Sequence, residues 1–181
     1  MPDVTIAKSI EKKVFKMEEE IIDSLEIEGF AQTTRDTRGI ALEIDGDICF
    51  ASSQVEMKPG LIEALDRSIE QILTAENDIR PIIVEGHTDS DIMRGKMAKI
   101  YPTNWELSSG RAAEVVKYLI SKGVNSTRLS PTGYADRWPF GITWTQKRSG
   151  EINQELIDAM NATRDLKRKN RRIKIIIGPN Y

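Results

Sequence analysis

The sequence has few of the residues on which metal sites and disulfides depend. Among its 181 residues there is one cysteine, Cys49, and one histidine, His87. A single cysteine excludes a disulfide within the chain. It does not identify the compartment, because a protein in a reducing compartment and an envelope protein that needs no disulfide can both have a single cysteine. With no second histidine, and with Cys49 on a distant predicted strand, zinc-like ligation is poorly supported. We therefore expect no metal site and no cofactor.

Long apolar runs are also absent. No run approaches the roughly 20 residues that a helix needs to cross a bilayer, and 39% hydrophobic with 30% charged residues is typical of a soluble globular protein. Residues 1–4 show no basic region followed by an apolar one, so no export signal is visible; either the protein is cytosolic or its targeting segment is missing from this sequence.

The charge balance gives no general reason to bind nucleic acid. The formal net charge is −2, and strong positive charge is the usual mark of nucleic-acid binding. One local exception is the basic cluster between Arg164 and Lys174. We interpret it as a solvated helix end whose cations suit the negative pole of the helix dipole.

The first thirty residues predict a helix that precedes the globular part. Apolar residues recur there at spacings of three and four, namely Ile6, Ile10, Val14, Met17, Ile21 and Leu25. This spacing describes an amphipathic linker helix over residues 1–30, ending near Gly29. Its apolar stripe could dock on the domain, pair with a second copy, or continue into a segment outside this sequence. Residues 31–181 have the length of one domain.

Strands alternate with helices through the rest of the chain. Residues 38–50 predict one or two strands around a turn at Asp45-Gly46, and Pro59 opens a helix that reaches about Asn77. The next elements are a strand at 81–85, a helix that stops at Lys122-Gly123, an edge strand at 128–135, a helix that turns residues 152–166 inward, and a last strand at 172–177. The order indicates an α+β fold, an α/β sandwich with a mixed sheet and helices packed on one face.

The strand at 81–85 ends in polar residues, Gly86 to Asp91 with the sequence GHTDSD. A hydrolase could pair His87 and Asp89 with Ser108 or Ser109, but no nucleophile-elbow pattern is present. A second interpretation is a binding corner at the carboxyl end of a strand, with Asp89 as a fixed anion. The alternative is that Thr88 and Asp89 only tie down the turn through bonds to the backbone.

Arg111 favours the binding corner. On helical spacing it lies at the flank of the apolar stripe, where a partly desolvated guanidinium requires an anionic partner. That partner could be structural, either Asp89 or Glu114. If Asp89 and Arg111 instead face one cleft, the pair matches a zwitterion such as the free end of an amino acid.

Four motifs resemble, in order, those of the OmpA-like peptidoglycan-binding domain. They are GHTD (86–89), NWELSSGRA (104–112), LISKGVNSTRLSPTGYA (119–135) and NATRDLKRKNRR (161–172), and the resemblance covers about residues 39–177. Within the family, the stretches ICFASSQVEMKPG and YPTNWELSS are most similar to MotB, the peptidoglycan-anchoring stator subunit of the flagellar motor.

The resemblance implies a non-catalytic domain that binds peptidoglycan. It implies that Asp89 and Arg111 hold the zwitterionic end of diaminopimelate in the stem peptide. The residues that it places around them are Thr88, Asn104, Leu107, Arg171 and Arg172. It further implies a periplasmic homodimer that is tethered to the inner membrane, through a missing N-terminal segment, beside an ion-channel subunit. An outer-membrane anchor and a non-flagellar ion-driven unit remain alternatives.

Two features depart from the family pattern. The segment 138–160 is longer than the loop that the family usually has at this place. We therefore expect an insertion at about 140–160 that adds a helix beside the cleft. Its aromatic residues Trp138, Phe140 and Trp144 either pack that helix or stack on glycan. The membrane-spanning segment of a whole stator subunit is absent, so ion conduction cannot reside in these residues.

Overall fold

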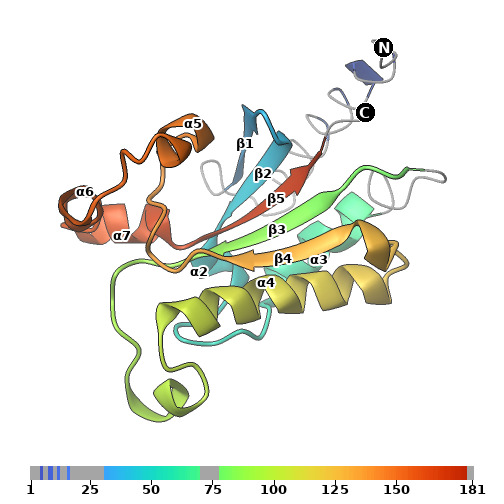
Figure 1. Ribbon diagram of the computed structural model, residues 1–181. Coiled ribbons are helices and arrows are strands. Elements are labelled where there is room, and N and C mark those ends of the chain that lie inside the picture. Colours follow the sequence, from blue (N-terminus) through green and yellow to red (C-terminus); the bar gives the residue numbers. More distant parts are fainter. Residues whose placement is uncertain are drawn as a thin grey trace.

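A mixed five-stranded sheet forms the centre of the molecule (Figure 1). The computed structural model describes residues 31–69 and 78–178, together with Thr5, Lys8, Ser9, Lys12 and Lys16. The strands are β1 (Ala31–Asp36), β2 (Gly39–Asp45), β3 (Ile82–His87), β4 (Leu129–Gly133) and β5 (Arg172–Ile177), in the order β1-β2-β5-β3-β4. Only the β3–β4 pair in this sheet is parallel.

Two helices cover one face of the sheet. They are α3 (Pro59–Ser68) and α4 (Asn104–Ser121). Alternate strand residues such as Leu42, Val84 and Ile175 point toward them and form one buried apolar core with Leu65 and Leu119. The predicted mixed sheet, the helices on one face and the strands β3, β4 and β5 are therefore confirmed, with β4 at the edge as Pro131 indicated.

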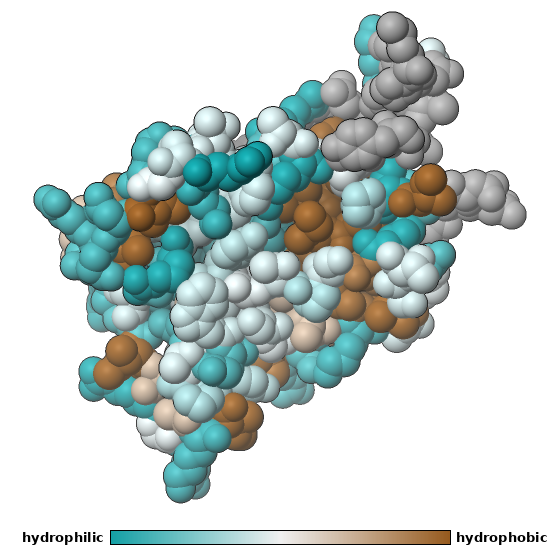
Figure 2. Space-filling view, in the orientation of Figure 1, coloured by the Kyte–Doolittle hydropathy of each residue, from teal (hydrophilic) through white to brown (hydrophobic). Residues whose placement is uncertain are grey.

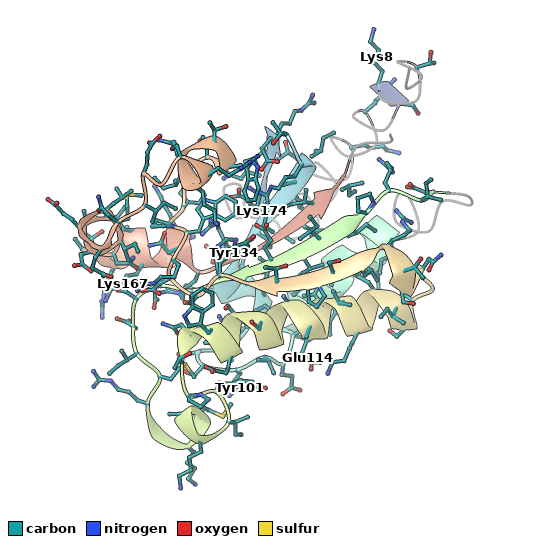
Figure 3. The ribbon with its side chains drawn as sticks, in the orientation of Figure 1. Lys8, Tyr101, Glu114, Tyr134, Lys167 and Lys174 are labelled. Atoms are coloured by element: carbon teal, nitrogen blue, oxygen red, sulfur yellow. The ribbon has the colours of Figure 1, made fainter. Side chains whose placement is uncertain are left out.

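The opposite face of the sheet is buried but charged. The other set of alternate residues carries Glu43, Glu85, His87, Arg172 and Lys174, all of them buried. The indole of Trp138, itself 2% exposed, packs against this face, at 5.6 Å between ring centroids from His87. Figure 3 shows the side chains that gather around Tyr134 and Lys174 here. The segment after β4 therefore acts as a cover for ionic residues.

The first hairpin lies elsewhere than predicted. Its turn is at Thr37-Arg38, between β1 and β2, and not at Asp45-Gly46. After β2 the chain forms the short helix α2 (Gly46–Cys49), because the Asp45 side chain accepts a hydrogen bond from Asp47 N at 2.8 Å and caps it. Of the one or two strands predicted over residues 38–50, one forms, β2, and Phe50 makes an isolated bridge to Met57.

The predicted helix over residues 152–166 is interrupted. A short helix, α5 (Trp144–Arg148), precedes it, and the predicted range holds α6 (Gln154–Ala159) and the start of α7 (Arg164–Asn170). Each has its own N-cap, Thr143, Asn153 and Thr163, whose side chain accepts from a backbone N–H in the first turn. These capping residues divide one amphipathic pattern into short helices.

Two further segments complete the described chain. The 3-10 helices η2 (Gly95–Lys99) and η3 (Ser126–Arg128) lie before and after α4.

The linker helix predicted over residues 1–30 falls outside the described residues, apart from five exposed positions that are helical. In the described part of the chain no helix has the length and apolar character to span a bilayer.

Candidate functional site

A pocket of about 380 Å³ lies at the end of the sheet where β3 runs into the following loop. Its walls come from α2 and the loop after it, the turn at 88–93, the first turns of α4, and the junction of α7 with β5. Six predicted site residues line it together: Thr88, Asp89, Asn104, Leu107, Arg111 and Arg171. Segments far apart in the sequence thus meet at one small cavity.

Asp89 is fixed in the pocket wall by two hydrogen bonds. One carboxylate oxygen accepts from Asp91 N at 2.9 Å and the other from Arg171 Nη1 at 2.6 Å. Arg171 also makes a two-point contact with Asp47, at 2.8 and 2.9 Å. The bonds to Asp47, and then to Asp89, raise the pKa of Arg171 above its ordinary value. One guanidinium therefore bridges two carboxylates, which leaves the cluster with a net negative charge.

Arg111 enters the same pocket from α4 and is bound only to neutral groups. Its Nε donates to Gln54 O at 2.9 Å and its Nη2 to Ala51 O at 3.2 Å, and the guanidinium lies 5.0 Å from the Phe50 ring centroid. Within the described part of the chain it has no carboxylate partner. Burial lowers the pKa of Arg111 to about 10, so the group stays cationic at neutral pH. A buried cation without an ion pair favours an anionic ligand.

The first turn of α4 positions the remaining polar groups. Thr103 caps the helix by accepting from Trp105 N at 3.1 Å, and the Glu106 carboxylate accepts from Thr103 N at 2.8 Å. Asn104 can then donate to Asp89 O and Asp91 O, at 3.1 and 2.9 Å, which holds the turn against the helix. The buried hydroxyl of Thr88 has no partner among the described residues and borders the pocket.

Gly86 brings β3 close to α4. It lies within β3 and its φ is not positive, so the backbone conformation alone does not require glycine here. A Cβ at this position would lie 2.1 Å from Ser108 O. Glycine is therefore needed for the close approach of backbone to backbone, and this approach places Asp89 beside Arg111.

Arg172 and His87 lie on the other face of the sheet. Arg171 precedes β5 and lines the pocket, whereas Arg172 opens the strand and points away, donating to Trp138 O and Asn170 O, both at 3.2 Å. The structure thus does not bring Arg172 to the pocket. His87 is fully buried beside Glu85, with 3.2 Å between His87 Nε2 and the Glu85 carboxylate.

Three pocket residues were not foreseen individually. Asp47 anchors Arg171, Phe50 lies under Arg111, and the Lys58 ammonium donates to Asp47 O at 2.5 Å. All three belong to the stretch 48–60 or directly precede it. The available signal was the acidic residue Asp47 directly after the predicted turn at Asp45-Gly46, but its contact with Arg171 depends on the formation of α2.

The arrangement suits recognition of a small doubly charged group. A carboxylate from the 88–91 turn and a guanidinium from α4 could hold an ammonium and a carboxylate of one ligand. In the described segments, no group of three or more His, Cys, Asp or Glu side chains is placed to hold a metal ion.

Comparison with known proteins decides the family. The model of the OmpA family matches residues 49–155, more than half of the chain. The chain belongs to the OmpA family. The matched range contains Asp89, Asn104 and Arg111, whereas Asp47 and Arg171 lie outside it.

The curated relatives of this OmpA-family chain are longer proteins, and the match covers only part of each. Protein YtxE of Bacillus subtilis (strain 168), which is uncharacterised, is 32% identical over 144 residues, covering 79% of this chain and 50% of YtxE. Outer membrane protein A of Serratia odorifera is 32% identical over 93 residues, covering 51% of this chain and 35% of that protein. The chain thus spans half or less of the length of these relatives.

Solved structures share the fold. A MotB-like protein from Desulfovibrio vulgaris superposes with a TM-score of 0.67 at 20% identity, covering 96% of both chains. The cell wall anchor of the type VI secretion system from Pseudomonas aeruginosa gives 0.64 at 20% identity, covering 90% of this chain and 97% of that one. The periplasmic domain of Helicobacter pylori MotB gives 0.61 at 21% identity, with 83% of each chain covered. At these identities the likeness shows a common OmpA-like fold.

Proposed function

We propose that this OmpA-family domain binds peptidoglycan without catalysis and anchors a membrane complex to the cell wall. Its pocket takes the zwitterionic end of diaminopimelate in the stem peptide, with the ammonium on Asp89 and the carboxylate on Arg111. The observation that carries the proposal is that Asp89 and Arg111 line one pocket of about 380 Å³. Asn104 and the unpartnered hydroxyl of Thr88 supply further hydrogen-bonding groups.

The charges in the pocket support a ligand with both signs. Asp89 and Asp47 share the guanidinium of Arg171, so the Asp89 carboxylate does not have that cation to itself and can also accept from a ligand ammonium. Among the described residues, the hydrogen-bond partners of Arg111 are backbone carbonyls, so a ligand carboxylate would supply its missing counter-charge. A ligand with a single charge would pair with only one of these two side chains, and a neutral ligand would pair with neither.

The anchored complex is proposed to be the stator of the flagellar motor, in a periplasmic homodimer tethered to the inner membrane. The fold likeness to a MotB-like protein and to the periplasmic domain of Helicobacter pylori MotB supports this assignment. The likeness to a type VI secretion wall anchor favours a second candidate, an anchor of a non-flagellar machine. Both candidates use the same wall-binding pocket.

The position of His87 does not support the hydrolase alternative. Its ring is buried on the far face of the sheet, stacked 5.3 Å from Tyr134, and it does not border the pocket. The Ser108 hydroxyl donates to Trp105 O at 3.2 Å and accepts from Ala135 N at 3.0 Å. These contacts give both side chains structural roles.

Retention on purified sacculi tests the proposal. Asp89→Ala and Arg111→Ala should each weaken binding by about 2–5 kcal/mol, because each leaves one ligand charge without its partner in a desolvated site. Glu114→Ala and Lys117→Ala are matched controls, since this exposed ion pair lies on α4 outside the pocket and should leave retention unchanged. Co-sedimentation at several protein concentrations measures the change.

A second probe separates diaminopimelate recognition from general wall binding. A free stem tripeptide with lysine in place of diaminopimelate lacks the carboxylate proposed for Arg111, so it should bind at least about tenfold more weakly. Undiminished retention of both site variants on sacculi would contradict the proposed pocket. Equal affinity for the two tripeptides would contradict the assignment of the ligand.

A further inference from the structure

A second pocket, of about 450 Å³, lies on the other side of the start of α4. Asn104 lines the first pocket, and its neighbour Trp105 lines the second. The remaining wall comes from the end of β4, with Tyr134, and from the insertion, with Lys147 and Gln154. Figure 3 places Tyr134 between α4 and the insertion, and in Figure 2 residues of intermediate hydropathy, pale in colour, gather in the middle of this face.

This second pocket presents aromatic surface to solvent. Trp105 is 49% exposed, which is unusual for so large a side chain, and Tyr134 is partly exposed beside it. Trp138, by contrast, is buried, and its indole N–H donates to Ile142 O at 2.7 Å. The packing role that we considered for the insertion aromatics therefore applies to Trp138. The most exposed ring in this pocket is that of Trp105, which was not among the residues predicted from the sequence to contact glycan.

Three hydrogen-bond donors of the pocket have no partner in the described part of the chain. They are the indole N–H of Trp105, the hydroxyl of Tyr134 and the ammonium of Lys147. Lys147 Nζ instead lies over aromatic rings, 5.1 Å from the centroid of Tyr134 and 5.4 Å from that of Trp138. The other cation of the wall, Arg137, is paired with Asp136 and also donates to Gln154 at 2.9 Å.

We propose that this pocket is a saccharide subsite that takes an N-acetylated hexosamine of the glycan strand. Exposed aromatic rings suit the apolar face of a pyranose, and the three free donors suit its hydroxyl and acetamido oxygens. A purely apolar ligand would leave those donors unsatisfied on binding. A strongly anionic ligand would find one unpaired cation, Lys147, which is already placed against aromatic rings.

The inference rests on the proposed function and extends it. Stem peptides are covalently joined to the glycan, so one muropeptide could occupy both pockets across the first turn of α4. The two pockets are also mechanically linked, because Ser90 N donates to Asn161 Oδ1 at 3.0 Å and Asn161 Nδ2 donates to Ile157 O at 2.9 Å. Ile157 borders the second pocket. The insertion is thus tied to the turn that carries Asp89.

Peptide-free glycan strands, prepared by removing the stem peptides from sacculi with an amidase, test the subsite. Wild-type protein should bind them saturably, and Trp105→Ala should weaken this binding about tenfold, the scale of one lost aromatic contact. Trp105→Phe should recover most of the affinity because it keeps a ring face. Ile120→Ala is the matched control, since Ile120 is 43% exposed on the same helix but outside the pocket.

A parallel titration with the glycan-free stem peptide distinguishes the two proposals. The loss in Trp105→Ala should be larger for glycan than for stem peptide. If the wild type binds stem peptide but not peptide-free glycan, or if Trp105→Ala binds glycan as well as Ile120→Ala does, the saccharide subsite is wrong and the proposed function stands. If glycan binds and stem peptide does not, the diaminopimelate pocket is wrong and the subsite stands.

Discussion

Asp89 and Arg111 are held in opposite ways. Asp89 already has a cationic partner, Arg171, whereas Arg111 donates to backbone carbonyls and has no carboxylate partner in the part of the chain that the structure describes. The sequence could suggest that both residues face one cleft, because one ends a strand and the other lies at the flank of a helix stripe. It could not show that Asp89 shares the Arg171 guanidinium with Asp47, because the contact between Arg171 and Asp47 joins residues 124 positions apart. Long-range pairs of this kind depend on the complete fold.

His87 makes the stability of the domain depend on pH. Burial, with the nearby Arg172 cation, lowers the pKa of His87 to about 4, although Glu85 and Glu43 oppose the shift. The unfolded chain, with the ordinary value of 6.5, binds this proton more tightly between pH 4 and 6.5. The free energy of unfolding should therefore fall as pH drops through this window, by roughly 3 kcal/mol at about 1.4 kcal/mol per pKa unit.

Urea unfolding at pH 7 and pH 4.5 measures this effect. His87→Gln cannot take up the proton, so its difference in stability between the two pH values should be clearly smaller than that of the wild type. An unchanged difference would show that other groups cause the acid sensitivity.

Among the elements, α4 supplies three of the six predicted site residues that line the pocket, Asn104, Leu107 and Arg111. Its start and end were predictable, because Thr103 and Glu106 form a capping box and Gly123 follows the last turn with a φ of 95°. The strands β3 and β5 were predictable from apolar runs. The strand β1, with the sequence AQTTRD, was not foreseen, because it has almost no apolar residues and depends on pairing with β2. The helices α6 and α7 were predicted as one, because the apolar spacing continues across the break that the cap Thr163 makes between them.

The capping box predicts a specific loss of stability. Thr103→Ala removes the acceptor for Trp105 N and should lower the free energy of unfolding by about 1 kcal/mol. Thr103→Ser keeps the hydroxyl and should retain most of the stability. Denaturant titrations of the two variants give the comparison, and equal stability of Thr103→Ala and wild type would contradict the role of the cap.

At the scale of the whole molecule, the sheet separates an apolar layer from an ionic one. The core against α3 and α4 could be predicted from periodicity. The ionic layer could not, because strand residues such as Glu43 and Lys174 look solvent-exposed in a sequence. In the fold Lys174 Nζ lies 3.1 Å from the Glu43 carboxylate, and the Trp138 ring is 5.6 Å from Lys174 Nζ. Neutralised pairs under an aromatic cover explain how this face stays buried.

Trp138 should therefore be a major contributor to stability. Trp138→Ala removes a ring that contacts His87, Tyr134 and Arg38 and exposes the charged layer, so we expect a loss of about 3–5 kcal/mol. Phe140, which is only half-buried, is the matched site: Phe140→Ala should cost clearly less. Thermal unfolding of both variants checks the order, and the reverse order would contradict the proposed cover.

A crystal structure of the domain soaked with meso-diaminopimelate tests the central claim most directly. The account predicts density in the pocket between α2 and α4, with one ligand carboxylate within hydrogen-bonding distance of Arg111 and the adjacent ammonium within hydrogen-bonding distance of Asp89. Density at another surface, or a ligand in the pocket that contacts neither side chain, would contradict it.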